Sequence, residues 1–224
     1  MARGAALFTG GKDSTRAVEV AMREGIEVEC LVTLIPLRED SWMYHSAALN
    51  VVDLLSEALG LPVVKRVSSG VKEEEVEDLY RALRGLDVEV VVSGVVASEY
   101  QRSRIEAVCR RLGLRPYNPL WGVDEEAHLR GLLRDGYEVM VTSVAALGLG
   151  PEWLGRVLDE GALEELRKLR RAYGVSMALE GGEGETLVLD SPIHKRRLVV
   201  EEAEREWRGR SGVLKIIKAS LRSK

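Results

Sequence analysis

The chain has 224 residues, enough for one large domain or for a domain with a smaller second one. Charged residues make up 30% and hydrophobic residues 46%, which is ordinary for a globular protein in water. The net charge of −4 argues against a dominant electrostatic grip on nucleic acid, so no direct nucleic-acid partner is expected.

The composition also indicates a compartment. No apolar run approaches the ~18 residues of a membrane span, and the N-terminus lacks the apolar core of a signal peptide, so we expect a cytoplasmic protein with no membrane partner. Cys30 and Cys109 form no C-x-x-C pair, and we expect both to be core residues in a reducing compartment. The single glutamine and two asparagines among many charges are typical of a thermophile.

The first half of the chain alternates short apolar runs with amphipathic stretches. The pattern predicts helices at 13–24, 44–60, 72–85 and 99–113, and strands at 4–8, 27–35, 62–67, 88–94 and 114–121. Such alternation predicts an α/β fold, a Rossmann-like parallel sheet with helices on both faces. Ligands of such sheets bind beyond the carboxyl ends of the strands, where residues 9–14, 33–43 and 94–99 lie.

The pattern changes after Trp121. Helices are predicted at 124–136 and 158–174 and a strand at 137–146, and shorter strand-like pieces follow from residue 180 onward. We therefore expect a domain of residues 1–122 and a smaller α+β domain, with some antiparallel pairing, of residues 123–224.

The stretch "AALFTGGKDSTRAVEV" places two glycines between the first strand and the first helix. It lacks the G-x-x-x-x-G-K-[ST] spacing of the Walker A loop and the third glycine of the dinucleotide fingerprint. The remaining pattern, T-G-G-K-D-S, resembles the S-G-G-x-D-S loop of the ATP pyrophosphatase (PP-loop) superfamily, with Thr9 in place of the first serine. The resemblance implies that the loop holds the pyrophosphate of ATP and that AMP is transferred to an acceptor oxygen.

The residue types suit an anion site. Gly10 and Gly11 let backbone N–H groups turn toward a phosphate, and the helix N-terminus adds its own donors. Lys12 supplies a cation, and the hydroxyls of Thr9 and Ser14 supply donors.

Asp13 would be unusual at a bare anion site. It is explained as an N-cap, as a carboxylate on the Mg²⁺ side of the triphosphate, or as both. A glycine turn capped by Asp13 and Ser14 with no ligand is the alternative. From their position in the fold, the backbone around Thr33 and Gly94 is expected to help bind adenine.

Four further segments resemble the diphthine–ammonia ligase family. They are "SWMYHSAALN" (41–50), "SGVVASEYQRSRIEAVCRRLGLRPYNPLWG" (93–122), "WLGRVLDEGALEEL" (153–166) and "EGGEGETLVLDSPIHKRRLVV" (180–200). Family members often carry an aromatic residue where this chain has Gly184. The resemblance implies that ATP and Mg²⁺ activate the carboxylate of diphthine, a modified histidine of translation elongation factor 2, as an acyl-adenylate. Ammonia then displaces AMP, and free ammonia is the simpler source because no segment is left for a glutaminase.

Diphthine carries a quaternary ammonium group, which carboxylates and aromatic faces can contact. We therefore assign substrate contacts to residues of three of these segments, and Trp42 is a further candidate. The substrate-binding candidates are Tyr44, His45, Tyr100, Gln101, Arg102, Glu180, Gly181, Gly182, Glu183, Glu185 and Thr186. The catalytic candidates are Lys12, Asp13, Arg104, Glu183 and Glu185; for Arg102 and Arg104 the alternative is surface salt bridging.

Two other classes of function stay open on the sequence. One is another PP-loop adenylating enzyme, acting on tRNA or a small carboxylate, although the net charge and the absent C-x-x-C count against tRNA. The other is a non-catalytic ATP-binding module. A homodimer is possible, and His194 could be structural or part of a site.

Overall fold

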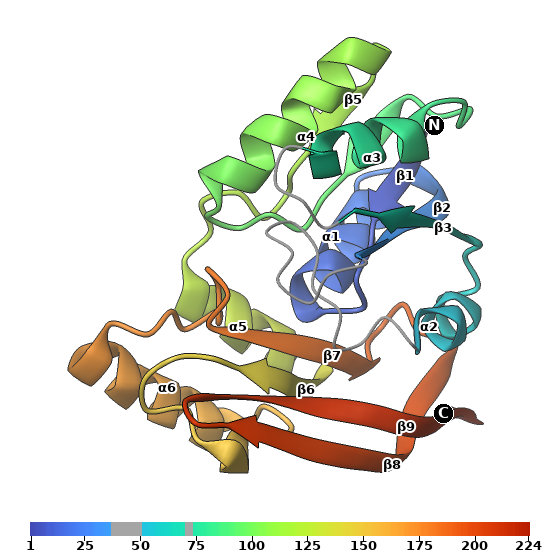
Figure 1. The fold of residues 1–224 in the computed structure, drawn as a ribbon. Helices are drawn as coiled ribbons and strands as arrows, with labels where there is room; N and C mark the ends of the chain where they lie inside the picture. The colour runs from blue at the N-terminus through green and yellow to red at the C-terminus, as the bar shows by residue number, and fades with distance from the viewer. Residues whose placement is uncertain (37–50, 70–73) are drawn as a thin grey trace. The chain divides into compact units, whose positions relative to one another are not determined.

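The computed structural model describes residues 1–36, 51–69 and 74–224. The chain forms two compact units, Met1–Gly122 and Val123–Lys224. Figure 1 shows a sheet with its own helices in each unit.

The first unit is built on a five-stranded sheet in the order β3-β2-β1-β4-β5, with every neighbouring pair parallel. Its strands are β1 (Ala2–Leu7), β2 (Ile26–Pro36), β3 (Val63–Ser68), β4 (Val90–Val92) and β5 (Arg115–Tyr117). Its helices are α1 (Lys12–Arg23), α2 (Val52–Leu59), α3 (Glu74–Leu83) and α4 (Glu99–Leu112). The predicted Rossmann-like parallel sheet is confirmed, although β4 is shorter than expected and the first part of the predicted helix 44–60 lies outside the described residues.

The strand order fixes where a ligand can bind. The chain moves from β1 outward to β2 and β3, then crosses back to β4 and on to β5. Because parallel crossovers are right-handed, the two directions of travel place the connecting helices on opposite faces of the sheet. The core on one face joins α3 and α4 to β1, β2 and β4, with Leu79, Val108 and Val91 fully buried. The order reverses between β1 and β4, which is the switch point of the sheet.

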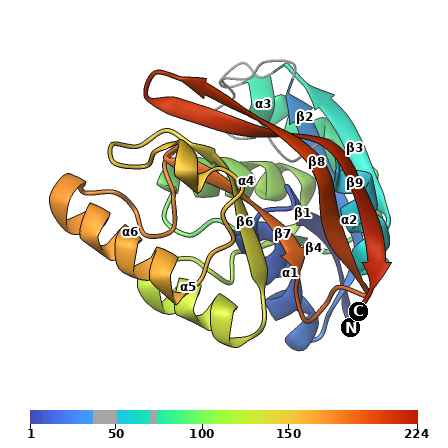
Figure 2. The same ribbon diagram turned by 90° about the horizontal axis from the view of Figure 1, so that it is seen from below.

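The second unit is an α+β structure with a four-stranded sheet in the order β7-β6-β9-β8, in which every neighbouring pair is antiparallel. Its elements are α5 (Glu125–Arg134), β6 (Glu138–Val144), the short 3₁₀ helix η2 (Pro151–Trp153), α6 (Glu160–Tyr173), β7 (Gly184–Asp190), β8 (Arg196–Arg208) and β9 (Ser211–Ser223). Figure 2 shows β8 and β9 as one long hairpin and α5 beside α6. The predicted antiparallel pairing is confirmed.

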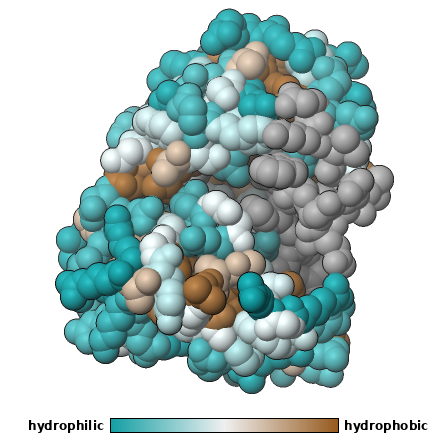
Figure 3. Space-filling view, turned by 60° about the vertical axis from the view of Figure 1, so that its left-hand side comes forward, coloured by the Kyte–Doolittle hydropathy of each residue, from teal (hydrophilic) through white to brown (hydrophobic). Residues whose placement is uncertain are grey.

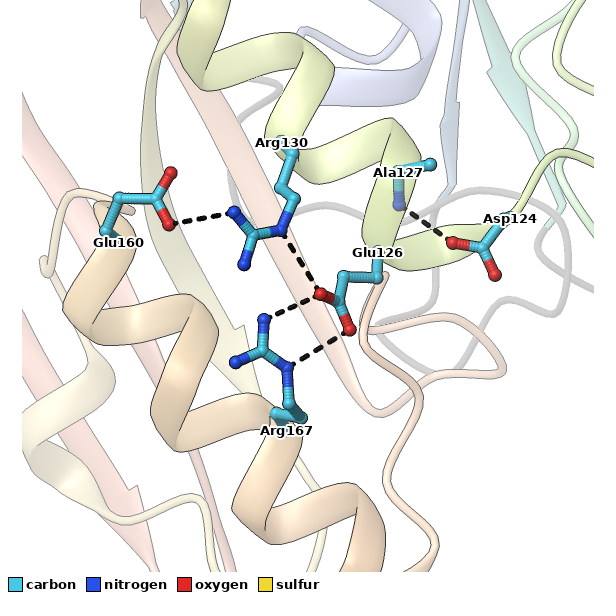
Figure 4. A network of polar contacts seen from close by, with 6 residues as sticks. All are labelled: Asp124, Glu126, Ala127, Arg130, Glu160 and Arg167. Carbon is cyan, nitrogen blue, oxygen red and sulfur yellow. Dashed lines mark hydrogen bonds and ion pairs between the residues drawn. The ribbon is translucent and has the colours of Figure 1, made fainter.

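An ion-pair network joins α5 to α6 (Figure 4). The Glu126 carboxylate accepts hydrogen bonds from Arg167 Nη2 at 2.6 Å and from Arg130 Nε at 3.2 Å. Arg130 also reaches Glu160 of α6 at 3.4 Å. The two guanidinium groups lower the pKa of Glu126 to about 2, because their hydrogen bonds favour the ionised carboxylate. The network therefore fixes the two helices against each other near neutral pH.

Both cysteines lie in the core of the first unit, as predicted: Cys30 is on β2 and Cys109 on α4. Burial raises the pKa of both thiols, that of Cys109 to about 11, which keeps them protonated and unreactive. On the face shown in Figure 3 hydrophilic side chains predominate, and apolar ones gather in small patches. Among the helices in the described parts of the chain, none is long and apolar enough to cross a membrane.

Candidate functional site

The glycine loop, residues 9–14, leaves the carboxyl end of β1 and enters α1 at the switch point of the sheet. Gly10 has a φ of +80°, in the left-handed region that glycine adopts without strain. Gly11 holds the N-cap position of α1, and because glycine has no side chain, no side-chain cap covers the first N–H groups of the helix. The expected N-cap role of Asp13 is therefore wrong, because the helix begins one residue earlier and Asp13 lies inside its first turn.

An uncapped helix start suits an anion. The first N–H groups of a helix and its positive dipole end attract negative charge, and a side-chain cap would compete for them. Within the loop, the Thr9 N–H donates to Ser14 Oγ at 3.4 Å, and Ser14 Oγ donates to the Gly11 carbonyl at 3.1 Å. These bonds link the two hydroxyl residues of the loop to each other and to Gly11.

Lys12 is almost fully buried, with 3% of its surface exposed, and its Nζ lies 2.7 Å from Asp13 Oδ2. A buried ammonium group needs a partner, and the neighbouring carboxylate supplies one. The pair places one cation and one carboxylate side by side at the start of α1. A cation suits the phosphates, and a single carboxylate is a usual protein contribution to Mg²⁺ bound with a triphosphate. No group of three or more potential metal ligands occurs in residues 1–36, 51–69 and 74–224.

Two residues expected near adenine lie against the glycine loop and its entrance. Thr33 on β2 is 1% exposed, and its Oγ1 donates to the carbonyl of Phe8 at 2.7 Å. Gly94 follows β4, and a Cβ built on it would lie 2.6 Å from the carbonyl carbon of Asp13 and from the nitrogen of Ser14. The structure therefore brings Thr33 and Gly94 to the loop from the strands on either side of β1.

The predicted residues at the start of α4 make local contacts. The Arg104 guanidinium lies over the Tyr100 ring, 3.5 Å from its centroid. Arg102 lies over the Trp121 ring at 4.0 Å and pairs with Glu99 at 3.1 Å. The geometry of Arg102 thus corresponds to the salt-bridging alternative, with an added cation–π contact.

The start of α4 has a cap that the sequence reading missed. Ser98 holds the N-cap position, and its Oγ accepts from the Gln101 N–H at 3.3 Å. The pattern S-x-x-Q at 98–101 is a capping-box signature and could have revealed it. Just before it, Ser93 Oγ and Asn118 Oδ1 lie 2.5 Å apart and join the ends of β4 and β5. Sequence spacing gave no sign of that pair.

The acidic loop, residues 180–186, lies in the second unit, and its last residues form the start of β7. Gly181 and Gly182 both have positive φ values, +70° and +84°, so this turn requires glycine. Glu183 Oε2 accepts from the Ser176 N–H at 2.6 Å, and its backbone carbonyl accepts from the Ala145 N–H at 2.7 Å. Glu183 thus anchors the loop to the structure around it.

Glu185 and Thr186 lie on β7, opposite Ser143 and Val141 of β6. The backbone N–H of Glu180, at the start of the loop, donates to Ser176 Oγ at 3.2 Å. At Gly184 a Cβ would lie 2.8 Å from the carbonyl oxygen of Ser143, so β7 approaches β6 too closely there for a side chain. The candidates Trp42, Tyr44 and His45 lie outside the described residues.

Comparison with known proteins agrees with the two-unit architecture. Residues 2–116 match the model of the diphthamide synthase N-terminal domain, and residues 124–221 match that of the diphthamide synthase C-terminal domain. A solved structure described as a predicted subunit of tRNA methyltransferase from Methanocaldococcus jannaschii covers 86% of this chain and 98% of its own. It has 14% identity and a TM-score of 0.43, too low to support an argument.

The chain is also similar to curated proteins named diphthine–ammonia ligase. The human protein is 36% identical over 90% of this chain and 84% of its own length. The zebrafish (Danio rerio) protein is 36% identical over 88% of this chain and 86% of its own. The Schizosaccharomyces pombe protein is 35% identical over 88% of this chain, which spans 36% of that longer relative. This chain therefore belongs to the diphthine–ammonia ligase family.

Proposed function

We propose that this protein is a diphthine–ammonia ligase, an AMP-forming enzyme that converts the diphthine residue of translation elongation factor 2 to its amide with ammonia and ATP. The observation that carries the proposal is the glycine loop, residues 9–14, at the switch point of a chain that matches both domains of this family. The loop accounts for splitting ATP, and the family membership identifies the acceptor.

The reaction has two balanced steps. In the first, a carboxylate oxygen of diphthine attacks the α-phosphorus of ATP, and pyrophosphate leaves. In the second, the nitrogen of ammonia attacks the activated carbonyl carbon, AMP leaves with the bridging oxygen, and the nitrogen loses a proton. Adenylation is needed because a carboxylate alone has no good leaving group.

The first unit would supply the electrostatics of ATP cleavage. Charge grows on the departing pyrophosphate, and fixed N–H donors and cations stabilise such charge most in a site that is already arranged for it. The start of α1 and the Lys12 ammonium group are placed for this task, with Lys12 held by Asp13 at 2.7 Å. Mg²⁺ bound with the triphosphate would neutralise further charge, with Asp13 as its protein ligand.

The second unit would contact the acceptor. Its acidic loop presents carboxylates, which suit the quaternary ammonium of diphthine. Glu180 and Glu185 are our candidates for that contact. The Glu183 carboxylate accepts a hydrogen bond from the Ser176 N–H at 2.6 Å, so we assign Glu183 to positioning the loop. Because its acceptor would be a factor of translation, we expect this enzyme in the cytoplasm.

The test is a complete reaction with purified protein, Mg-ATP, an ammonium salt and elongation factor 2 that carries diphthine. We expect AMP only when all components are present, and a factor whose mass decreases by the difference between OH and NH₂. Lys12→Met should abolish AMP formation. Lys218→Met, which removes an exposed lysine paired with Glu201 on the β8–β9 hairpin, is the matched control and should retain it.

Other outcomes would change the assignment. AMP without the mass change in the factor would keep the adenylation chemistry and move the acceptor to tRNA or a small carboxylate. ATP binding without AMP, whatever the acceptor, would refute the ligase proposal in favour of a binding module.

A further inference from the structure

The glycine loop is held at its entrance by β2. The Phe8 N–H donates to the Val32 carbonyl at 2.9 Å, as expected for a parallel pair of strands. The Phe8 carbonyl then accepts the Thr33 hydroxyl at 2.7 Å, and Thr33 is 1% exposed. Both backbone groups of the residue before Thr9 are thus fixed by the neighbouring strand.

The segment after β4 lies directly against the exit of the loop. A Cβ on Gly94 would lie 2.6 Å from both the Asp13 carbonyl carbon and the Ser14 nitrogen, and 2.7 Å from the Asp13 oxygen. These are backbone atoms of the first turn of α1, which cannot turn aside as a flexible side chain can. Gly94 has no positive φ, so the reason for glycine here is close approach to that turn.

Between these two points the hydrogen bonds of the Thr9 side chain are long. Thr9 Oγ1 lies 3.3 Å from Ser14 Oγ and 3.4 Å from the Gly11 nitrogen. Bonds of this length are weak and hold Thr9 loosely. The bond from Thr33 to Phe8 is shorter, at 2.7 Å, and the segment at Gly94 lies directly against the first turn of α1, so both limit where the N–H groups of the loop can point.

We propose that Thr33 and Gly94 are positioning residues for pyrophosphate binding: they fix the entrance and exit of the glycine loop before ATP arrives. The inference rests on the proposed function, because it takes this loop to be the pyrophosphate site. It assigns these two side-chain positions a role apart from the expected contribution of the nearby backbone to adenine binding. Their action is indirect, through the Phe8 carbonyl and through the backbone of Asp13 and Ser14.

Binding of separate parts of ATP tests the proposal. We would measure, by titration calorimetry with the full chain and MgCl₂, the affinities for ATP, AMP and pyrophosphate. Thr33→Val keeps the shape and removes the hydroxyl, and Gly94→Ala adds the methyl group. Each variant should bind pyrophosphate and ATP about 10- to 100-fold more weakly, as the loss of outer-shell support does at metal sites, and should bind AMP with unchanged affinity. Thr33→Ser, which keeps the hydroxyl, should restore binding.

Matched controls separate this role from general damage. Thr142→Val makes the same change at a threonine of β6 that is 0% exposed, and Gly131→Ala makes the same change in α5, where the new Cβ meets only Arg134 Nη2 at 3.9 Å. Both should bind pyrophosphate as the unmodified protein does. If Gly94→Ala does not fold, Thr33→Val decides the question by itself.

The remaining outcomes overturn the inference. Weaker binding of AMP and ATP with unchanged binding of pyrophosphate would mean that the residues contribute to the adenine site. Equal weakening of all three ligands would mean general damage, and no change in any would mean that the loop needs no such support. If the unmodified protein bound neither ATP nor pyrophosphate, the proposed function would fail as well, so the two failures are distinguishable.

Discussion

His194 makes the stability of the second unit depend on pH. It is 4% exposed, and its Nδ1 lies 2.6 Å from Ser191 Oγ, but its buried Nε2 has no hydrogen-bond partner among the described residues. Burial lowers the pKa of His194 to about 4; Asp190 acts in the opposite direction, and the Lys224 ammonium group lowers the pKa further. Lys224 itself pairs with Asp190 at 2.6 Å.

The sign and size of the effect follow from the two pKa values. The unfolded chain takes up the proton near pH 6.5 and the folded chain only near pH 4, so the unfolded state binds more protons in between. This contribution to stability is fully present above about pH 6.5 and is lost as the pH falls to about 4. The shift corresponds to about 3 kcal/mol at 1.36 kcal/mol per pKa unit.

The assay compares denaturant unfolding of the unmodified protein and of His194→Phe from about pH 7 to about pH 4. The carboxylates are the same in both proteins, so the difference between the two pH profiles isolates the contribution of the histidine. We expect the unmodified protein to lose about 3 kcal/mol more than the variant. Ser191→Ala is the control, because it removes the serine partner and should keep the pH dependence.

Parallel profiles for the unmodified protein and His194→Phe would refute the reasoning, since they would mean that the buried imidazole titrates like a free one. NMR titration of the imidazole carbon protons gives an independent answer. The signal absent from His194→Phe should titrate near pH 4 in the folded protein.

Three substitutions test the packing of the second unit by thermal and chemical unfolding. Gly184→Ala should destabilise by about 1–3 kcal/mol, because its Cβ would meet the Ser143 carbonyl at 2.8 Å; an unchanged midpoint would show that β7 can shift away. Glu183→Ala should cost about 1–3 kcal/mol through the lost acceptor of the Ser176 N–H, and Glu183→Gln should recover most of it. Trp153→Ala should cost about 3–5 kcal/mol because Trp153 is 2% exposed, and a small loss would contradict its place in the core.

The architecture of the first unit could be predicted because its local signals agree with one another. The predicted helices 44–60 and 99–113 end at Gly60 and Gly113, and both glycines have the left-handed conformation that ends a helix. The continuous apolar strands indicated a sheet buried on both faces. Each of these features depends on a few neighbouring residues, so the sequence alone expresses it.

The details of the site could not be predicted in the same way, because they depend on contacts between distant segments. Aspartate is a common N-cap residue, but Gly11 holds the N-cap position of α1 in place of Asp13. Arg102 could have faced a phosphate, but Trp121 supplies a ring beneath it. Thr33 was expected near adenine because it lies toward the carboxyl end of its strand. Only the structure shows that its hydroxyl donates to the Phe8 carbonyl.

The hairpin of the second unit was also underestimated. β8 and β9 have 13 residues each, and the pairing shifts register near residues 200–203. β8 lies at the edge of the sheet, where charged residues are favoured, so its sequence shows little of the alternation that marks a half-buried strand. The strand exists because β9 pairs with it, and pairing partners cannot be read from local pattern.

The segments that relate this chain to its family serve different purposes. In the segment 153–166, the Arg156 guanidinium lies over the buried Trp153 ring at 4.6 Å and forms two hydrogen bonds to Glu165, at 2.7 and 3.0 Å. Asp159 caps α6 by accepting the Ala162 N–H at 2.7 Å. These contacts hold the segment after η2 to α6, which indicates a structural role for it. Substitutions in this segment should therefore lower the free energy of unfolding without changing the amount of amide formed per AMP, whereas substitutions in residues 9–14 should reduce AMP formation in a protein that remains folded.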